Sequence, residues 1–247
     1  MPRNAICLLT IHPHPVWIDF LNQWNHYDVY VFVDRDKKDQ DDVKKNMKTI
    51  YVSDEECRRR GFIHSSYMPY SSIVFPEIIA WDRALCFMTD PSTPRYDQVW
   101  FLEDDVFVYD ETVLRNIDSK YPVSDILCKD KNPQPQPGEW CWFWPAVHLP
   151  FPEPYFHSTI CAVRLSGLFL DKLGEYASTH GKLAFIEAFF PSLVVHHGMN
   201  YVMGIEEMQT LHWRRDWDVP SELNTRQIFH PAKDTLVHKE WRRVITK

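Results

Sequence analysis

Three consecutive carboxylates at the end of an apolar run constrain the fold of this chain more than any other feature. Residues 99–102 are apolar, Glu103, Asp104 and Asp105 follow directly, and apolar residues then resume. Three unpaired carboxylates cannot enter a hydrophobic core, because removing an ionised carboxylate from water costs too much free energy. The acids are therefore expected at the end of a buried strand, where a divalent cation is the simplest group to compensate their charge.

The residues before this run alternate between strand-like and helix-like patterns. Residues 5–11 and 28–33 are apolar runs typical of buried strands, and residues 15–25 repeat apolar side chains at helical spacing. A strand, a helix and a second strand in this order form a βαβ unit, in which the two strands are parallel. Ligands of such sheets bind at the carboxyl ends of the strands, where Asp34 and the acidic triplet both fall.

The rest of the chain continues the α/β pattern. We expect further strands at 49–52, 125–128, 158–163 and 198–203, helices at 75–88, 110–120, 166–176 and 183–195, and irregular structure at 53–74 and in the Pro-rich 132–138. The charged segment 35–48 is predicted to be a solvated helix or loop. The predicted fold class is α/β, with a mixed, mainly parallel sheet flanked by helices in a single domain.

Charge, hydropathy and cysteine spacing exclude several classes of protein. The net charge of -7 disfavours general nucleic-acid binding, which depends on neutralising phosphates. No apolar run approaches the roughly 18–20 residues that span a bilayer, and no signal peptide is recognised, so we expect a cytoplasmic protein without a transmembrane segment. The six cysteines form no CxxC pair, which indicates reduced buried thiols, with a disulfide between some of them as the alternative.

Two motifs add a family resemblance to this pattern. The sequence Phe-Leu-Glu-Asp-Asp-Val at 101–106 is similar to a DxD motif with Glu in its first position, and Phe-His-Pro-Ala-Lys at 229–233 is similar to a late His-Pro-x-Lys motif. Asp34 after the second strand and Arg83 on the helix before the acidic strand complete the pattern. With these features the chain resembles nucleotide-sugar glycosyltransferases of the GT-A fold, a Rossmann-like architecture.

The resemblance implies a metal-dependent enzyme of glycan biosynthesis. Such an enzyme moves a sugar from a UDP- or GDP-linked donor to a hydroxyl group of a glycan or glycoconjugate, with Mn²⁺ or Mg²⁺ as cofactor. It implies that residues 1–110 are the half of one compact domain that binds the nucleotide-sugar, and that residues 111–247 are the half that binds the acceptor.

The same resemblance implies roles for individual residues. The implied metal ligands are Glu103, Asp105 and His230. The implied contacts with the nucleotide-sugar are Ile11, His12, Asp34, Arg83, Glu103, Asp104 and Lys233. His212, Arg214 and Arg215 are further candidates for phosphate contact, and solvated surface charge is the alternative reading of these three.

An inverting enzyme of this kind also needs a carboxylate that deprotonates the acceptor hydroxyl. Glu187 is favoured, because it is the one acid in the apolar helix predicted at 183–195 and such surroundings raise the pKa of a carboxyl group. Glu206 and Glu207 are the other candidates. A retaining mechanism stays open.

Two other functions compete with this hypothesis. The run that ends in Asp34 and Asp36 is similar to the start of haloacid-dehalogenase-like phosphohydrolases, but that reading leaves the acidic triplet unexplained. A non-catalytic carbohydrate-binding domain would use the aromatic segment 140–156, since flat aromatic walls suit the CH faces of sugars.

Overall fold

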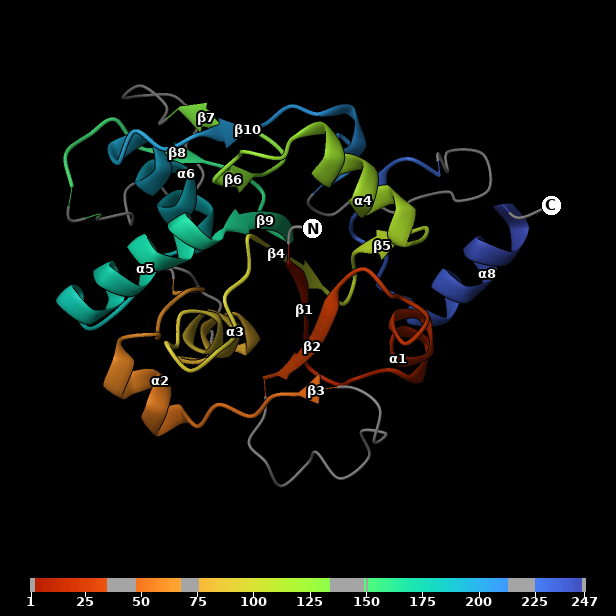
Figure 1. Ribbon diagram of the computed structural model, residues 1–247, viewed down its shortest axis with the longest axis horizontal. Helices are drawn as coiled ribbons and strands as arrows, with labels where there is room; N and C mark the ends of the chain where they lie inside the picture. Colours follow the sequence, from red (N-terminus) through yellow and green to blue (C-terminus); the bar gives the residue numbers. More distant parts are fainter. Residues whose placement is uncertain are drawn as a thin grey trace.

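A mainly parallel sheet forms the centre of the molecule (Figure 1). The computed structural model describes residues 3–34, 48–67, 76–133, 149, 151–212 and 225–245. Among these residues the main sheet has the order β10-β6-β9-β4-β1-β2-β3. Its strands are β1 (Asn4–Thr10), β2 (Asp28–Val33), β3 (Lys48–Thr49), β4 (Gln98–Glu103), β6 (Ile126–Leu127), β9 (Ala162–Ser166) and β10 (Tyr201–Val202). Only β9 runs antiparallel to its neighbours in this sheet, which confirms the predicted mixed, mainly parallel α/β architecture.

Helices cover both faces of the sheet. They are α1 (Pro15–Leu21), α2 (Asp54–Arg60), α3 (Ala80–Met88), α4 (Glu111–Lys120), α5 (Gly167–His180), α6 (Ile186–His196) and α8 (Thr235–Ile245), with the short 3₁₀ helix η3 (Glu206–Met208). Side chains of β1 alternate between two cores: Cys7 packs with α3, α5 and α6, and Leu8 packs with α1 and α4. This alternation follows from the two-residue period of a strand buried on both faces.

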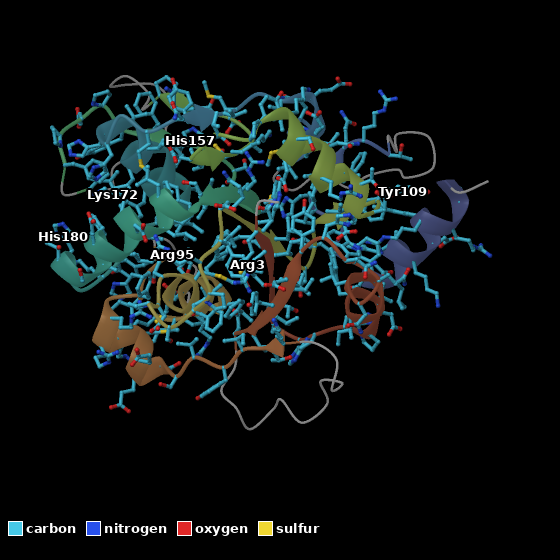
Figure 2. The ribbon with its side chains drawn as sticks, in the orientation of Figure 1. Arg3, Arg95, Tyr109, His157, Lys172 and His180 are labelled. Carbon is cyan, nitrogen blue, oxygen red and sulfur yellow. The ribbon has the colours of Figure 1, made fainter. Side chains whose placement is uncertain are left out.

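Two small sheets extend the main one. They are made of β5 (Phe107–Val108) with β11 (Ile228–Phe229), and of β7 (Asn132–Pro133) with β8 (Phe156–His157). Arg95, labelled in Figure 2, lies shortly before β4 in the sequence. Its guanidinium connects the start of β4 to α5 by donating to both carboxylate oxygens of Asp171, at 2.5 and 2.6 Å. None of the helices in the described ranges is long and apolar enough to cross a membrane.

The structure corrects several predicted elements. Residues 54–60 form α2 within the segment predicted to be irregular, and the strand predicted at 158–163 is displaced to 162–166. The Ser53 hydroxyl caps α2 by accepting from the Glu56 N–H, a Ser-x-x-Glu pattern that is visible in the sequence. The helix predicted from residue 75 begins at Ala80, and α8 was not predicted.

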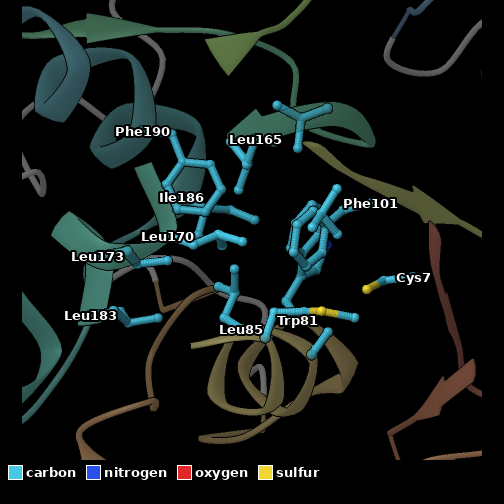
Figure 3. Close-up of a cluster of buried hydrophobic side chains, with 14 of the residues drawn as sticks. Cys7, Trp81, Leu85, Phe101, Leu165, Leu170, Leu173, Leu183, Ile186 and Phe190 are labelled. Atoms are coloured by element: carbon cyan, nitrogen blue, oxygen red, sulfur yellow. The ribbon is translucent and has the colours of Figure 1, made fainter. Parts of the chain in front are cut away.

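The side chain of Trp81 links α3 to the central strand. Its ring stacks on Phe101 of β4, with ring centroids 5.5 Å apart, and Figure 3 shows this pair in the core beside Cys7 and Leu85. Trp81 is 3% exposed. Because the residue is anchored in this way, its indole N–H is held at the carboxyl end of β4.

Candidate metal centre

Three side chains from distant parts of the chain converge at the carboxyl end of β4. Glu103 is the last residue of β4, Asp105 follows in the turn, and His230 directly follows β11. Each of the three residues offers one potential ligand atom, and these three atoms all lie within 4.8 Å of one another. The three residues predicted to be metal ligands therefore lie together.

The antiparallel pair of β5 and β11 brings His230 to the acidic turn. Phe229 pairs with Phe107 in this small sheet, and the Ala232 N–H donates to the Asp105 carbonyl at 2.6 Å. His230 Nδ1 lies 2.7 Å from the His212 carbonyl oxygen, which orients the ring. Its Nε2 atom consequently faces Asp105 Oδ1 at 3.3 Å. An oriented imidazole of this kind is typical of histidines that bind metals.

The charges of the three groups influence one another. Burial raises the pKa of Glu103 to about 7, although the Trp81 indole opposes this shift by donating to Oε1 at 2.8 Å. Burial also acts to raise the pKa of Asp105, but His230 and Lys233 outweigh it and hold that pKa below its ordinary value. Burial acts to lower the pKa of His230, but the adjacent Cys161 thiol and Asp105 raise it. A cation bound here would replace the proton on His230, since metal ligation requires the neutral imidazole.

The donor set fits a divalent cation. Asp105 Oδ1 is buried and faces the imidazole nitrogen Nε2 of His230 at 3.3 Å. Two carboxylates and one imidazole suit Mn²⁺, and carboxylates suit Mg²⁺. A buried carboxylate oxygen beside two further potential ligand atoms is the arrangement that a bound cation would complete.

Further acidic groups line the adjacent strand ends. The Asp34 N–H donates to the Thr10 carbonyl at 3.1 Å, which extends the pairing of β2 with β1, and the Asp34 carboxylate accepts from the Ala80 N–H. Asp104 accepts a hydrogen bond from the Thr10 hydroxyl. Burial, Asp105 and Asp34 raise the pKa of Asp104 against the effect of this bond. The sheet edge beside the three ligands is therefore polar and negatively charged.

The predicted nucleotide contacts fall into two groups. Ile11 and His12 are exposed directly after β1, and Lys233 is exposed close enough to Asp105 to lower the pKa of that group. These three residues are accessible to a ligand. Arg83 is buried and directs its guanidinium to the Val52 carbonyl and the Asp54 carboxylate, and its predicted contact with the donor stays a prediction.

Among the three candidates for the catalytic base, Glu187 interacts electrostatically with the metal ligands Glu103 and His230. It is the second residue of α6, and its carboxylate accepts from the Ile160 N–H at 3.4 Å. Burial raises the pKa of Glu187 to about 8, Glu103 contributes to this rise, and His230 opposes it. Glu207 instead forms an ion pair with Lys120 of α4 at 3.2 Å, and Glu206 is exposed on η3.

Sequence reasoning missed two residues of the site. Trp81 donates to Glu103, and Cys161 contacts His230 through its thiol. Neither residue belongs to a motif, so the sequence holds no signal for these contacts. Asp36, Arg214, Arg215 and most of the aromatic segment 140–156 lie outside the described residues.

Comparison with known proteins gives no relative from which a role could be transferred. No protein-family model matches the chain, and no curated protein matches it significantly.

Proposed function

We propose that the chain is a metal-dependent glycosyltransferase of the GT-A fold, which moves a sugar from a nucleoside-diphosphate donor to a hydroxyl acceptor. One observation carries the proposal: Glu103, Asp105 and His230 come from two motifs far apart in the sequence and meet at the carboxyl end of a parallel sheet. This edge is where open α/β sheets bind nucleotides. If the DxD-like motif and the His-Pro-x-Lys segment had unrelated roles, we would not expect their side chains to lie within reach of one cation.

We assign each role in the proposed reaction to particular residues. Asp105, Glu103 and His230 would hold the cation, which supplies Lewis-acid stabilisation of the negative charge that develops on a leaving diphosphate. Lys233 is the nearby cationic side chain that we assign to a phosphate oxygen. We assign Asp34 and His12, which follow neighbouring strands, to contact with the nucleoside.

Glu187 is assigned the role of the base. A carboxyl group with a pKa near 8 accepts a proton more readily than an ordinary glutamate does, and a base works best when its pKa lies near the working pH. Its position in the first turn of α6 and its contact with Ile160, which lies shortly before β9, support this assignment.

A screen of nucleotide sugars tests the proposal. Purified protein is incubated with UDP- and GDP-linked sugars in Mn²⁺ or in EDTA, and release of UDP or GDP is measured. We expect Mn²⁺-dependent release from one donor class, and loss of release in Asp105→Ala. The fold of that variant should persist, because the hydrogen bond that joins Asp105 to Ala232 is made by its backbone carbonyl.

The matched control is Glu240→Ala, which removes an exposed carboxylate from α8. Calorimetric titration of UDP and GDP in the presence of Mn²⁺ completes the experiment. Binding of neither nucleotide under any metal condition would reject the proposal. Binding of glycans without metal or nucleotide would instead support a non-catalytic carbohydrate-binding domain, and Mn²⁺-dependent hydrolysis of simple phosphate esters would support the phosphohydrolase alternative.

A further inference from the structure

The acidic turn at residues 103–105 is held in place by hydrogen bonds to its backbone. The Trp17 indole Nε1–H donates to the Asp104 carbonyl at 2.7 Å, and the Ala232 N–H donates to the Asp105 carbonyl at 2.6 Å. Trp17 belongs to α1, whereas Ala232 lies between β11 and α8. Two segments that are far apart in the sequence therefore fix the backbone that carries the candidate metal ligands.

One buried side chain of α8 contacts both of these groups. His238 is 0% exposed, and its Nε2 atom lies 2.8 Å from the Ala232 carbonyl oxygen. Its ring also packs edge-on against the Trp17 indole, with ring centroids 5.4 Å apart. Figure 1 shows α8 next to α1, the helix that carries Trp17. His238 is therefore in contact with both groups that hold the acidic turn.

Aromatic side chains fix the orientation of the His238 ring. Phe107, in the short strand that follows the acidic turn, contacts the ring edge-on with centroids 5.4 Å apart. Trp241, about one turn further along α8, stacks on it with the ring planes 13° apart. Because these rings and Trp17 pack around the imidazole, its Nε2 atom is held toward the Ala232 carbonyl.

The His238 imidazole acts as a neutral hydrogen-bond donor. A carbonyl oxygen only accepts hydrogen bonds, so the Nε2 atom beside Ala232 carries a proton. The Nδ1 atom is buried, and none of the described residues gives it a hydrogen-bond partner. Burial lowers the pKa of His238 to about 4, although the hydrogen bond to Ala232 opposes this shift. The ring therefore supports the site without adding charge to it at neutral pH.

The peptide that His238 holds lies beside the candidate ligands. Ala232 is two residues after His230, and its N–H holds the backbone of Asp105. His230 Nε2 in turn faces Asp105 Oδ1 at 3.3 Å. Metal sites require ligand distances within about 0.2 Å of their ideal values, so a small shift of the Ala232 peptide would disturb two ligands at once.

We propose that His238 is a positioning residue of the candidate metal centre, which joins the Trp17 and Ala232 contacts into one support and thereby sets the affinity for the cation. It contacts neither the cation nor a substrate. This role rests on the metal centre of the proposed function, but it does not depend on sugar transfer, because the same support would serve any reaction of a cation held by Asp105 and His230.

His238→Phe tests this role, because phenylalanine keeps an aromatic ring among the same neighbours and removes the donor to Ala232. We expect the dissociation constant for Mn²⁺, measured by isothermal titration, to rise about 10-fold, the lower end of the effect typical of groups that orient a ligand. His238→Gln should restore most of the lost affinity, since its amide can donate near the position of Nε2. Lys239→Ala, at an exposed position of α8, is the matched control and should bind Mn²⁺ as the wild type does.

A double variant measures the connection between the two contacts. Trp17→Phe keeps an aromatic ring and removes the donor to the Asp104 carbonyl, so we expect it to weaken Mn²⁺ binding as well. If His238 joins the two contacts, Trp17→Phe with His238→Phe should lose less affinity than the product of the two separate losses, because residues of one network do not act additively. If His238→Phe fails to fold, His238→Asn replaces it in both comparisons, because its shorter amide does not reach the Ala232 carbonyl.

Three results would overturn the proposal. The first is a folded variant without the donor that binds Mn²⁺ as tightly as the wild type, since a purely structural role lowers the melting temperature and leaves the affinity of the folded fraction unchanged. The second is a double variant whose loss equals the product of the separate losses. The third is a wild type that binds no Mn²⁺. Failure of the proposed function alone looks different: Mn²⁺ would bind and depend on His238, but no nucleotide sugar would release its nucleotide.

Discussion

The Trp81 side chain connects the hydrophobic core with the candidate metal centre. One face of its ring stacks on Phe101, and its Nε1–H donates to Glu103 Oε1 at 2.8 Å. The indole thus fixes the direction of a carboxylate whose burial would otherwise favour the protonated form. Losing a group that orients a metal ligand in this way typically lowers the affinity for the metal about 10- to 100-fold.

Trp81→Phe separates these two roles, because phenylalanine preserves the aromatic contact with Phe101 and removes the N–H donor. We expect the affinity for Mn²⁺ to fall about 10- to 100-fold, the effect typical of losing a group that orients a ligand. Isothermal titration with Mn²⁺ measures this change. An affinity equal to that of the wild type would show that Glu103 does not depend on the indole.

Glu187 makes the stability of the protein depend on pH. In the unfolded chain its carboxyl ionises near the ordinary pKa of 4.5, whereas burial in the folded state raises that pKa to about 8. The folded state therefore binds the proton more tightly, and this contribution to stability is complete below pH 4.5 and is lost as the pH rises to about 8.

Glu187→Gln removes this dependence, because glutamine does not ionise. The difference in free energy of unfolding between variant and wild type should shift in favour of the variant as the pH rises from about 5 to about 8.5. We expect this shift to be about 2–4 kcal/mol, after allowance for the partial exposure of the residue. Urea denaturation at the two pH values measures the difference. The exposed Glu206→Gln should show no such gain, and an equal change in both variants would exclude the proposed origin.

At the scale of elements, α8 holds the segment that carries His230. This helix packs on α1 (Figure 1), and its Arg242 guanidinium donates to the Val108 carbonyl at 2.9 Å and lies 3.4 Å from the centre of the Phe20 ring. Burial lowers the pKa of Arg242 to about 9. These contacts fasten α8 to β5, which pairs with β11 immediately before His230.

Arg242→Ala should loosen this attachment. It leaves the Val108 carbonyl without this donor and removes the cation from the aromatic rings, so we expect a loss of about 2–3 kcal/mol in free energy of unfolding. The affinity for Mn²⁺ should fall as well, because His230 depends on β11. The exposed Arg243→Ala is the matched control, with a change within about 0.5 kcal/mol. Similar losses in the two variants would show that α8 is not held through Arg242.

At the scale of the whole molecule, the metal centre joins the acidic turn after β4 to a segment close to the C-terminal helix. A cation held by both would stabilise the folded state, because the three ligands are not assembled in the unfolded chain. At a Mn²⁺ concentration about 100 times the dissociation constant, the expected stabilisation is about 2.7 kcal/mol.

For a chain of this length such a stabilisation corresponds to a rise of about 5–10 °C in melting temperature. Differential scanning fluorimetry in Mn²⁺ and in EDTA measures it. Asp105→Ala should abolish the shift, and Glu240→Ala should retain it. A shift of equal size in Asp105→Ala would place the cation elsewhere.

Local patterns in the sequence were sufficient for the central part of the fold. The apolar runs before Asp34 and Glu103 predict β2 and β4, and the βαβ unit predicts their parallel arrangement, because burial on both faces and short connections leave few alternatives. The cap of α2 at Ser53 was also readable but was missed. The boundaries of α3 and β9 were not readable, since they depend on contacts with distant segments.

The acidic triplet illustrates the division between sequence and tertiary structure. The sequence by itself determined that Glu103, Asp104 and Asp105 end a buried strand, because ionised carboxylates cannot follow apolar residues into the core. Only the tertiary structure decided that Asp104 turns to Thr10 and that His230 joins the other two.

The same division holds for the candidate base. The sequence offered Glu187, Glu206 and Glu207 as candidate bases and favoured Glu187 because of its apolar surroundings. Packing of α6 placed Glu187 beside Ile160, where its charge interacts with Glu103 and His230. Which residues become neighbours across a long stretch of chain is set by how whole elements pack, and single-residue patterns do not encode it.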